Sequence, residues 1–144
     1  MVRELQKKDI DEVAEIWLDT NVKAHGFIPA RYWRDNFETV RRMLGQAEVY
    51  VYEAEKDIAG FIGLDGDYIA GIFVRSNHQS GGIGKRLLDF VKGERQQLRL
   101  SVYQKNKRAV SFYEREKFVI QGEGTDEHTG ENEYDMIWRS GNDE

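Results

Sequence analysis

The chain has 144 residues, of which 40% are hydrophobic and 33% are charged, with a formal net charge of −5 and no cysteine. This length favours one domain with a core large enough to fold without cross-links, and the lack of cysteine excludes disulfides, thiolate metal ligands and a cysteine nucleophile. No apolar run approaches a membrane span and no signal peptide follows Met1, so we expect a cytoplasmic protein with residues 1–140 as one domain and 141–144 as a short tail.

The N-terminal part of the chain predicts a strand and two helices. A short strand at residues 2–5 precedes an amphipathic helix, whose apolar positions repeat at helical spacing from Ile10 onwards. A second amphipathic helix follows Pro29, a favourable first-turn residue, and ends at Gly45.

Three segments rich in β-branched and aromatic residues follow, and they predict antiparallel strands at 49–53, 58–64 and 68–74. Asp65-Gly66 between the second and the third is a strong hairpin signal.

The C-terminal part alternates helices and strands. We expect a helix from Ile83, a strand at 98–102, a helix around 109–113 and a hairpin of strands at 118–121 and 133–139. A strand, a helix and a further strand imply a parallel pair between 68–74 and 98–102. The predicted order is βααβββαβαββ, an α+β fold with three αβα layers and a mixed, mostly antiparallel sheet with helices on both faces.

The loop before the helix at Ile83 reads Gln79-Ser80-Gly81-Gly82-Ile83-Gly84-Lys85. Its glycines let a ligand approach the backbone, and the following helix offers unpaired N–H groups and the positive end of its dipole. These features predict a phosphate-binding cradle; an ordinary flexible connection is the alternative. The P-loop motif fails because Arg86 stands where Ser or Thr is required, and the dinucleotide motif fails at Leu87.

Charge is unevenly distributed along the chain. Residues 75–108 hold nine basic and two acidic residues, a net charge of +7, whereas the segments on either side are acidic. A solvated charge run on two helices is one interpretation, and an anion site is the other. The basic residues nearest the glycine loop and the helix around 109–113 are Arg75, Lys85, Arg86, Lys107 and Arg108.

Two spaced motifs resemble the GCN5-related N-acetyltransferase (GNAT) family. Gln79-x-x-Gly82-x-Gly84, after Phe73-Val74, is similar to the acyl-CoA-binding motif of that family. Further on, the family's Asn-x-x-Ala-x-x-Phe-Tyr segment is matched by Asn106, Ala109, Phe112 and Tyr113, with Phe118 downstream. Lys117 departs from the pattern, since the family has Gly there to end the helix in a left-handed conformation.

The resemblance implies an enzyme that moves acetyl directly from acetyl-CoA to a primary amine of a small molecule or a protein, in a ternary complex and without a metal. The residues that it assigns to the co-substrate are Ile72, Phe73, Val74, Gln79, Ser80, Gly81, Gly82, Ile83, Gly84, Lys85, Asn106, Ala109, Phe112 and Tyr113. A backbone amide near Ile72 or Phe73 is the candidate oxyanion donor; a plain buried strand is the other interpretation of this apolar run.

Tyr113 matches the general acid of the family, because a phenol is protonated at neutral pH and can protonate the leaving thiolate. A core aromatic residue is the alternative for Tyr113, and a helix N-cap is the alternative for Asn106.

The acceptor side is less specific. The segment that contains His25, Phe27 and Tyr32 resembles the bacterial YjaB-like subgroup of the family, which places these three residues at the acceptor pocket. The general base stays open between His25 and a water chain to an acidic residue.

Two other functions compete with catalysis. A non-catalytic module that binds or senses acyl-CoA would use the same fold, and a nucleic-acid binder would use the basic segment. The acidic flanks and the lack of interleaved aromatic residues disfavour the second. We expect neither nucleic acid nor membrane as a partner, and either a monomer or a homodimer.

Overall fold

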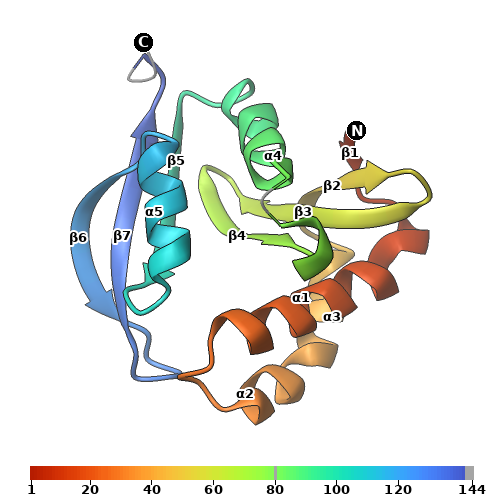
Figure 1. Ribbon diagram of the computed structural model, residues 1–144, viewed down its shortest axis with the longest axis horizontal. Coiled ribbons are helices and arrows are strands. Elements are labelled where there is room, and N and C mark those ends of the chain that lie inside the picture. Colours follow the sequence, from red (N-terminus) through yellow and green to blue (C-terminus); the bar gives the residue numbers. More distant parts are fainter. Residues whose placement is uncertain (80, 142–144) are drawn as a thin grey trace.

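The computed structural model describes residues 1–79 and 81–141, and Figure 1 shows a seven-stranded sheet with helices on both faces. The sheet order is β1-β2-β3-β4-β5-β7-β6. Its strands are β1 (Val2–Glu4), β2 (Glu48–Ala54), β3 (Asp57–Asp65), β4 (Tyr68–Val74), β5 (Gln97–Tyr103), β6 (Val119–Thr125) and β7 (Asn132–Arg139). All neighbouring strands are antiparallel except β4 and β5, which are parallel as predicted.

The helices are η1 (Lys7–Asp9), α1 (Ile10–Ala24), α2 (Ala30–Asp35), α3 (Phe37–Leu44), η2 (Ser76–His78), α4 (Ile83–Lys92) and α5 (Lys107–Arg115). The prediction of a single helix after Pro29 is wrong, because Asn36 divides this segment into α2 and α3. The Asn36 side chain donates to the Tyr32 carbonyl at 2.7 Å, and Asn36 is both the C-cap of α2 and the N-cap of α3, with φ −96° and ψ 0°. An Asn side chain that competes for helical carbonyls favours such a break.

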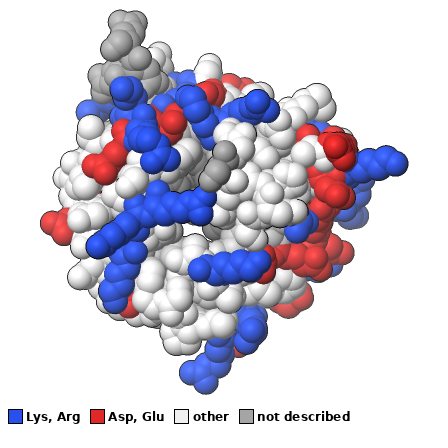
Figure 2. Space-filling view, viewed as in Figure 1, with Lys and Arg blue, Asp and Glu red and all other residues white. Residues whose placement is uncertain are grey.

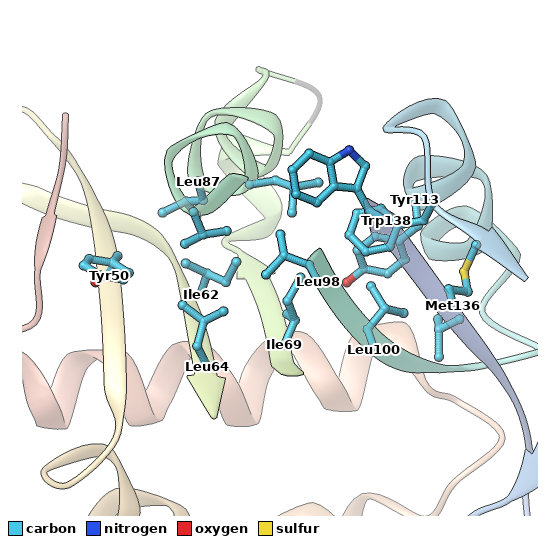
Figure 3. Close-up of a cluster of buried hydrophobic side chains, with 14 of the residues drawn as sticks. Tyr50, Ile62, Leu64, Ile69, Leu87, Leu98, Leu100, Tyr113, Met136 and Trp138 are labelled. Atoms are coloured by element: carbon cyan, nitrogen blue, oxygen red, sulfur yellow. The ribbon is translucent and has the colours of Figure 1, made fainter. Parts of the chain in front are cut away.

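Two hydrophobic clusters lie on opposite faces of the sheet. One lies between the strands and α4 and α5, with Ile62, Leu87, Leu98 and Met136 among its fully buried members, and Figure 3 shows how they meet. The other lies between the strands and α1 and α3, around Val13 and Phe61. The expected three-layer αβα arrangement is therefore confirmed.

A β-bulge distorts β4 at its centre. Gly63 of β3 pairs with Gly71, whereas the next residue, Leu64, pairs with Ile69, so that Ala70 is an extra residue in β4. A bulge of this kind bends the strand and increases its twist. The Phe73 ring lies over Gly71, where an added Cβ would come within 2.4 Å of it.

Candidate active site

The parallel pair between β4 and β5 is very short. Tyr68 pairs with Arg99, the Arg99 N–H donates to the Asp67 carbonyl at 2.8 Å, and no further pair joins the two strands in the described part of the chain. Beyond Tyr68, β4 turns away from β5, and in Figure 1 the two halves of the sheet stand at a steep angle. The edge of β4 at residues 72–74 thus faces a space into which another extended backbone could pair.

The residues predicted at this edge lie where β4 has left β5. Ile72, Phe73 and Val74 pair on one side with β3 and have half-buried side chains. Both interpretations of this run therefore hold together: the side chains contribute to the core, and the backbone edge stays open towards β5.

Gln79 connects the glycine loop to both neighbouring elements. Its side-chain amide donates to the Val74 carbonyl at 3.0 Å, and its Oε1 accepts from the Arg108 guanidinium at 2.8 Å. Gln79 thereby joins the end of β4 to the first turn of α5. Ser80, predicted in this loop, lies outside the described residues.

The following residues start α4. Gly82 precedes the helix at φ +82°, a left-handed conformation that favours glycine. The Ile83 side chain is buried in the core, so only its backbone is available to a ligand. Gly84 lies against α5, since an added Cβ would stand 3.5 Å from the Phe112 ring. Together with the exposed Gly81, these residues place the N-terminus of α4 beside the open edge of β4.

The five basic residues singled out in the sequence separate into two groups. Arg75 and Lys85 are held by the protein itself: Arg75 contacts Glu12 at 2.9 Å and donates to the Ile58 carbonyl, while Lys85 contacts acidic side chains on α4 and after α5. Other cations of the basic segment are paired likewise, in Arg95–Glu48, Arg99–Asp67 and Lys105–Glu131. Much of the +7 is therefore compensated across the fold.

The other three basic residues lie near the starts of α4 and α5. Arg86 donates to the Tyr52 hydroxyl at 2.6 Å, Arg108 contacts Gln79, and Lys107 is exposed at the start of α5. On the face drawn in Figure 2, Lys and Arg side chains gather around a hollow near the centre, and acidic ones gather at one edge. This distribution favours an anion beside the two helix starts.

Tyr113 reaches from α5 into the core beside β5. The residue is 8% exposed, and its ring packs edge-on to Phe112 and Phe118 at centroid distances of 5.3 and 5.6 Å. Figure 3 shows its hydroxyl turned towards β5 near Leu98. Burial, with a smaller contribution from Tyr68, raises the pKa of the Tyr113 hydroxyl. The hydroxyl is therefore protonated at neutral pH.

Asn106 is the N-cap of α5, as its alternative interpretation predicted. Its Oδ1 accepts from the Ala109 N–H at 3.2 Å, and its Nδ2 lies 3.1 Å from Nε2 of His25. His25 follows α1, and its ring is surrounded by aromatic residues, with centroids 5.0 Å from Tyr103 and 5.4 Å from Trp33. Burial lowers the pKa of His25 to about 4.

The three residues predicted at the acceptor side lie close together, since the rings of His25 and Phe27 meet edge-on at a centroid distance of 5.6 Å. Phe27 and Tyr32 line a cavity of about 300 Å³ between α2 and the β6–β7 turn, together with Ile28, Pro29, Arg31, Asp35, His128 and Thr129. His25 stands outside this lining, against α5. Its Nε2 is engaged by Asn106, which disfavours His25 as the general base.

Sequence reasoning missed an acidic group next to this cavity. The Tyr103 hydroxyl donates to Asp126 at 2.6 Å, and Tyr103 stands opposite Glu133 in the β5–β7 pair. Burial raises the pKa of Glu133, and the nearby Asp126 and Asp135 raise it further. Residues two apart in a strand lie on the same face, so the predicted strand at 133–139 already places Glu133 and Asp135 together. Nothing in the sequence brings Asp126 to them.

Two kinds of site are absent from residues 1–79 and 81–141. They contain no group of three or more His, Asp and Glu residues placed to hold a metal ion. No helix among them is both long enough and apolar enough to cross a membrane.

Comparison with known proteins decides the family. A family model described as an acetyltransferase (GNAT) domain matches residues 20–138. The chain belongs to the GNAT family. This acetyltransferase is 37% identical over 122 residues to the peptidyl-lysine N-acetyltransferase YiaC of Escherichia coli K12, a match that covers 83% of this chain and 84% of that protein. The peptidyl-lysine N-acetyltransferase YjaB of the same strain is 26% identical over 122 residues, which cover 84% and 83% of the two chains.

Solved structures show the same fold. The solution structure of apo-form YjaB from Escherichia coli matches with a TM-score of 0.86 at 23% identity and covers 96% of each chain. The paiA N-acetyltransferase of Thermoplasma acidophilum, in complex with coenzyme A, matches with a TM-score of 0.79 at 18% identity and covers 96% of this chain and 98% of that one. The family and fold expectations are confirmed, and the protein is an N-acetyltransferase with acetyl-CoA as its co-substrate.

Proposed function

We propose that this acetyltransferase modifies lysine side chains of polypeptides. The observation that carries the proposal is the 37% identity to a peptidyl-lysine N-acetyltransferase over most of both chains. A second observation supports it: the cavity beside Phe27 and Tyr32 is lined by Asp35, and the negative charge of Asp126 acts on Tyr32, so that both carboxylates attract a cationic side chain. The finer expectations of a cytoplasmic enzyme, a single domain over residues 1–140 and a monomer or homodimer stay predictions.

The site fits an acyl-CoA in three respects. The open edge of β4 at residues 72–74 offers backbone partners to the amides of an extended pantetheine arm. The amides that start α4, from Gly82 onwards, suit a pyrophosphate, with Lys107 and Arg108 supplying positive charge. Asn106 accepts the cap bond through Oδ1 and directs one Nδ2 hydrogen to His25, which leaves its second Nδ2 hydrogen for a ligand. Ser80, Gly81, Gly84 and Lys85 are assigned to the same loop, and Ala109 and Phe112 support it from α5.

Acetyl-CoA supplies a thioester whose acetyl group moves to the amine. A C–N bond forms as the C–S bond breaks, the amine gives up one proton, and the thiolate takes one. We assign the proton that the thiolate takes to Tyr113, whose residue is buried and whose hydroxyl is protonated at neutral pH. A β4 amide near Ile72 or Phe73 stabilises the negative charge that develops on the carbonyl oxygen.

The proton from the amine requires a base on the acceptor side. Glu133 faces Tyr103 across the β5–β7 pair, and its neighbours Asp126 and Asp135 favour uptake of a proton. We assign this role to Glu133 acting through water, in place of His25. Phe27 and Tyr32 hold the aliphatic part of the acceptor side chain.

A panel of acceptors tests the proposal. The protein is incubated with acetyl-CoA and either a lysine peptide, the same peptide with arginine in place of lysine, or a polyamine, and CoA release and acetylated product are followed by mass spectrometry. We expect acetylation of the lysine peptide alone, or at a much higher rate. Acetylation of the polyamine without the peptide would show a small-molecule acceptor and contradict the proposal.

A further inference from the structure

Asn106, the N-cap of α5, fixes the tautomer of His25, which lies 81 residues earlier in the chain. Asn106 Oδ1 accepts from the Ala109 N–H, so the other atom of its amide group, Nδ2, faces His25. Nδ2 is a donor only, and Nε2 of His25 must therefore accept. The His25 ring is then neutral, with its proton on Nδ1.

His25 holds this state at a cost that an apolar ring would avoid. Its Nδ1 is buried and has no hydrogen-bond partner in the described part of the chain. Phe27, Trp33 and Tyr103 surround the ring with their own rings, an environment that would suit phenylalanine equally well. What histidine adds over phenylalanine here is the lone pair on Nε2, and this lone pair is used by Asn106.

The hydrogen bond joins two parts of the site. His25 begins the segment between α1 and α2, and Phe27 of this segment lines the acceptor-side cavity together with Tyr32 of α2. Asn106 begins α5, which carries Tyr113 seven residues later, about 10 Å along the helix axis. The backbone N–H of Asn106 also donates to the Tyr103 carbonyl at the end of β5. The start of α5 is thus held from β5 and from the α1–α2 segment together.

We infer that His25 is a positioning residue for acetyl-CoA, acting through Asn106. By holding Nδ2 in one orientation, His25 presents the remaining Nδ2 hydrogen and the first turn of α5 to the co-substrate. This inference rests on the proposed function, because it assumes that acetyl-CoA lies against Asn106. His25 touches neither substrate and exchanges no proton in this role.

Paired substitutions separate positioning from packing. His25→Phe keeps an aromatic ring and removes the acceptor atom, whereas His25→Gln keeps an acceptor, the Oε1 oxygen, near the place of Nε2. Loss of one such hydrogen bond corresponds to roughly a three- to tenfold weakening. We expect His25→Phe to raise Kd and KM for acetyl-CoA by this factor with little change in kcat, and His25→Gln to restore most of the loss.

A double-mutant cycle with Asn106→Ala makes the test specific. If His25 acts through Asn106, His25→Phe adds no further loss of acetyl-CoA affinity to Asn106→Ala. Equal affinity of His25→Phe and the unsubstituted protein, or additive losses in the cycle, would overturn the inference. Calorimetric Kd values remain informative if no acceptor is acetylated, so failure of the proposed function and failure of the inference give different results.

A measurement on the unsubstituted protein covers the case in which a variant does not fold. Nitrogen NMR of the His25 ring distinguishes its two neutral forms. We expect a protonated Nδ1 and an unprotonated Nε2 at neutral pH. A proton on Nε2 would place two donors face to face and rule out the hydrogen bond from Asn106.

Discussion

Lowering the pH destabilises this protein through His25. The ring keeps a pKa of about 4 in the folded chain, whereas the unfolded chain has the ordinary value of 6.5. Between these two values the unfolded chain binds one more proton, so the free energy of unfolding decreases as the pH falls. The full difference corresponds to about 3.4 kcal/mol, and partial contact of the ring with solvent reduces it to about 2 kcal/mol.

Urea unfolding followed by tryptophan fluorescence measures this contribution. The free energy of unfolding is determined between pH 7 and pH 4.5 for the unsubstituted protein and for His25→Phe, which lacks the titrating ring. Carboxylates contribute equally to both series, so the difference between the slopes isolates His25. We expect the unsubstituted protein to lose about 2 kcal/mol more than the variant. Parallel slopes would refute the burial argument.

Three further predictions concern other elements. Tyr113→Phe lowers kcat by roughly a hundredfold or more with an unchanged Kd for acetyl-CoA; an unchanged kcat would leave the non-catalytic interpretation of the site in place. Lys117→Gly raises the free energy of unfolding by about 1 kcal/mol, because Lys117 ends α5 at φ +74°, and an equal or lower stability in urea would contradict this. Gly60→Ala lowers stability by about 2 kcal/mol, since its Cβ would stand 2.6 Å from the Phe73 carbonyl oxygen, whereas the control Gly63→Ala meets its nearest side chain at 4.0 Å; equal losses in thermal melts would count against the steric argument.

Much of the fold could be predicted because each strand carries its own signal. Alternating apolar residues place the predicted strands within a few residues of the observed ones, and the range 68–74 is the observed β4. The structure adds a bulge within this strand, at Ala70. The predicted family follows from motifs that are contiguous in sequence, which is why it could be named from the residues alone.

The remaining features depend on contacts between distant parts of the chain. Asn36 breaks a helix through a local side-chain bond that periodicity does not reveal. Arg75 stands beside the glycine loop in sequence, yet Glu12 from α1 pairs with it. The partner of His25 lies 81 residues away, and only the folded chain brings Asn106 to it. Charge and hydrogen-bond partners of this kind are decided by tertiary packing, so composition cannot supply them.

Within residues 1–79 and 81–141, one residue pair joins β4 to β5, and this boundary divides the sheet into two parts. Across this boundary, the two parts are joined by side chains of the cluster beneath α4 and α5, while the backbone ladder is left incomplete. A co-substrate lying along β4 would form backbone hydrogen bonds that β5 does not supply, so that acetyl-CoA acts as a structural component as well as an acetyl donor. At a hundredfold excess over its Kd, such a ligand adds about 2.7 kcal/mol to the folded state. The rigidity of the enzyme, and its resistance to proteases, would then follow the supply of acetyl-CoA in the cell.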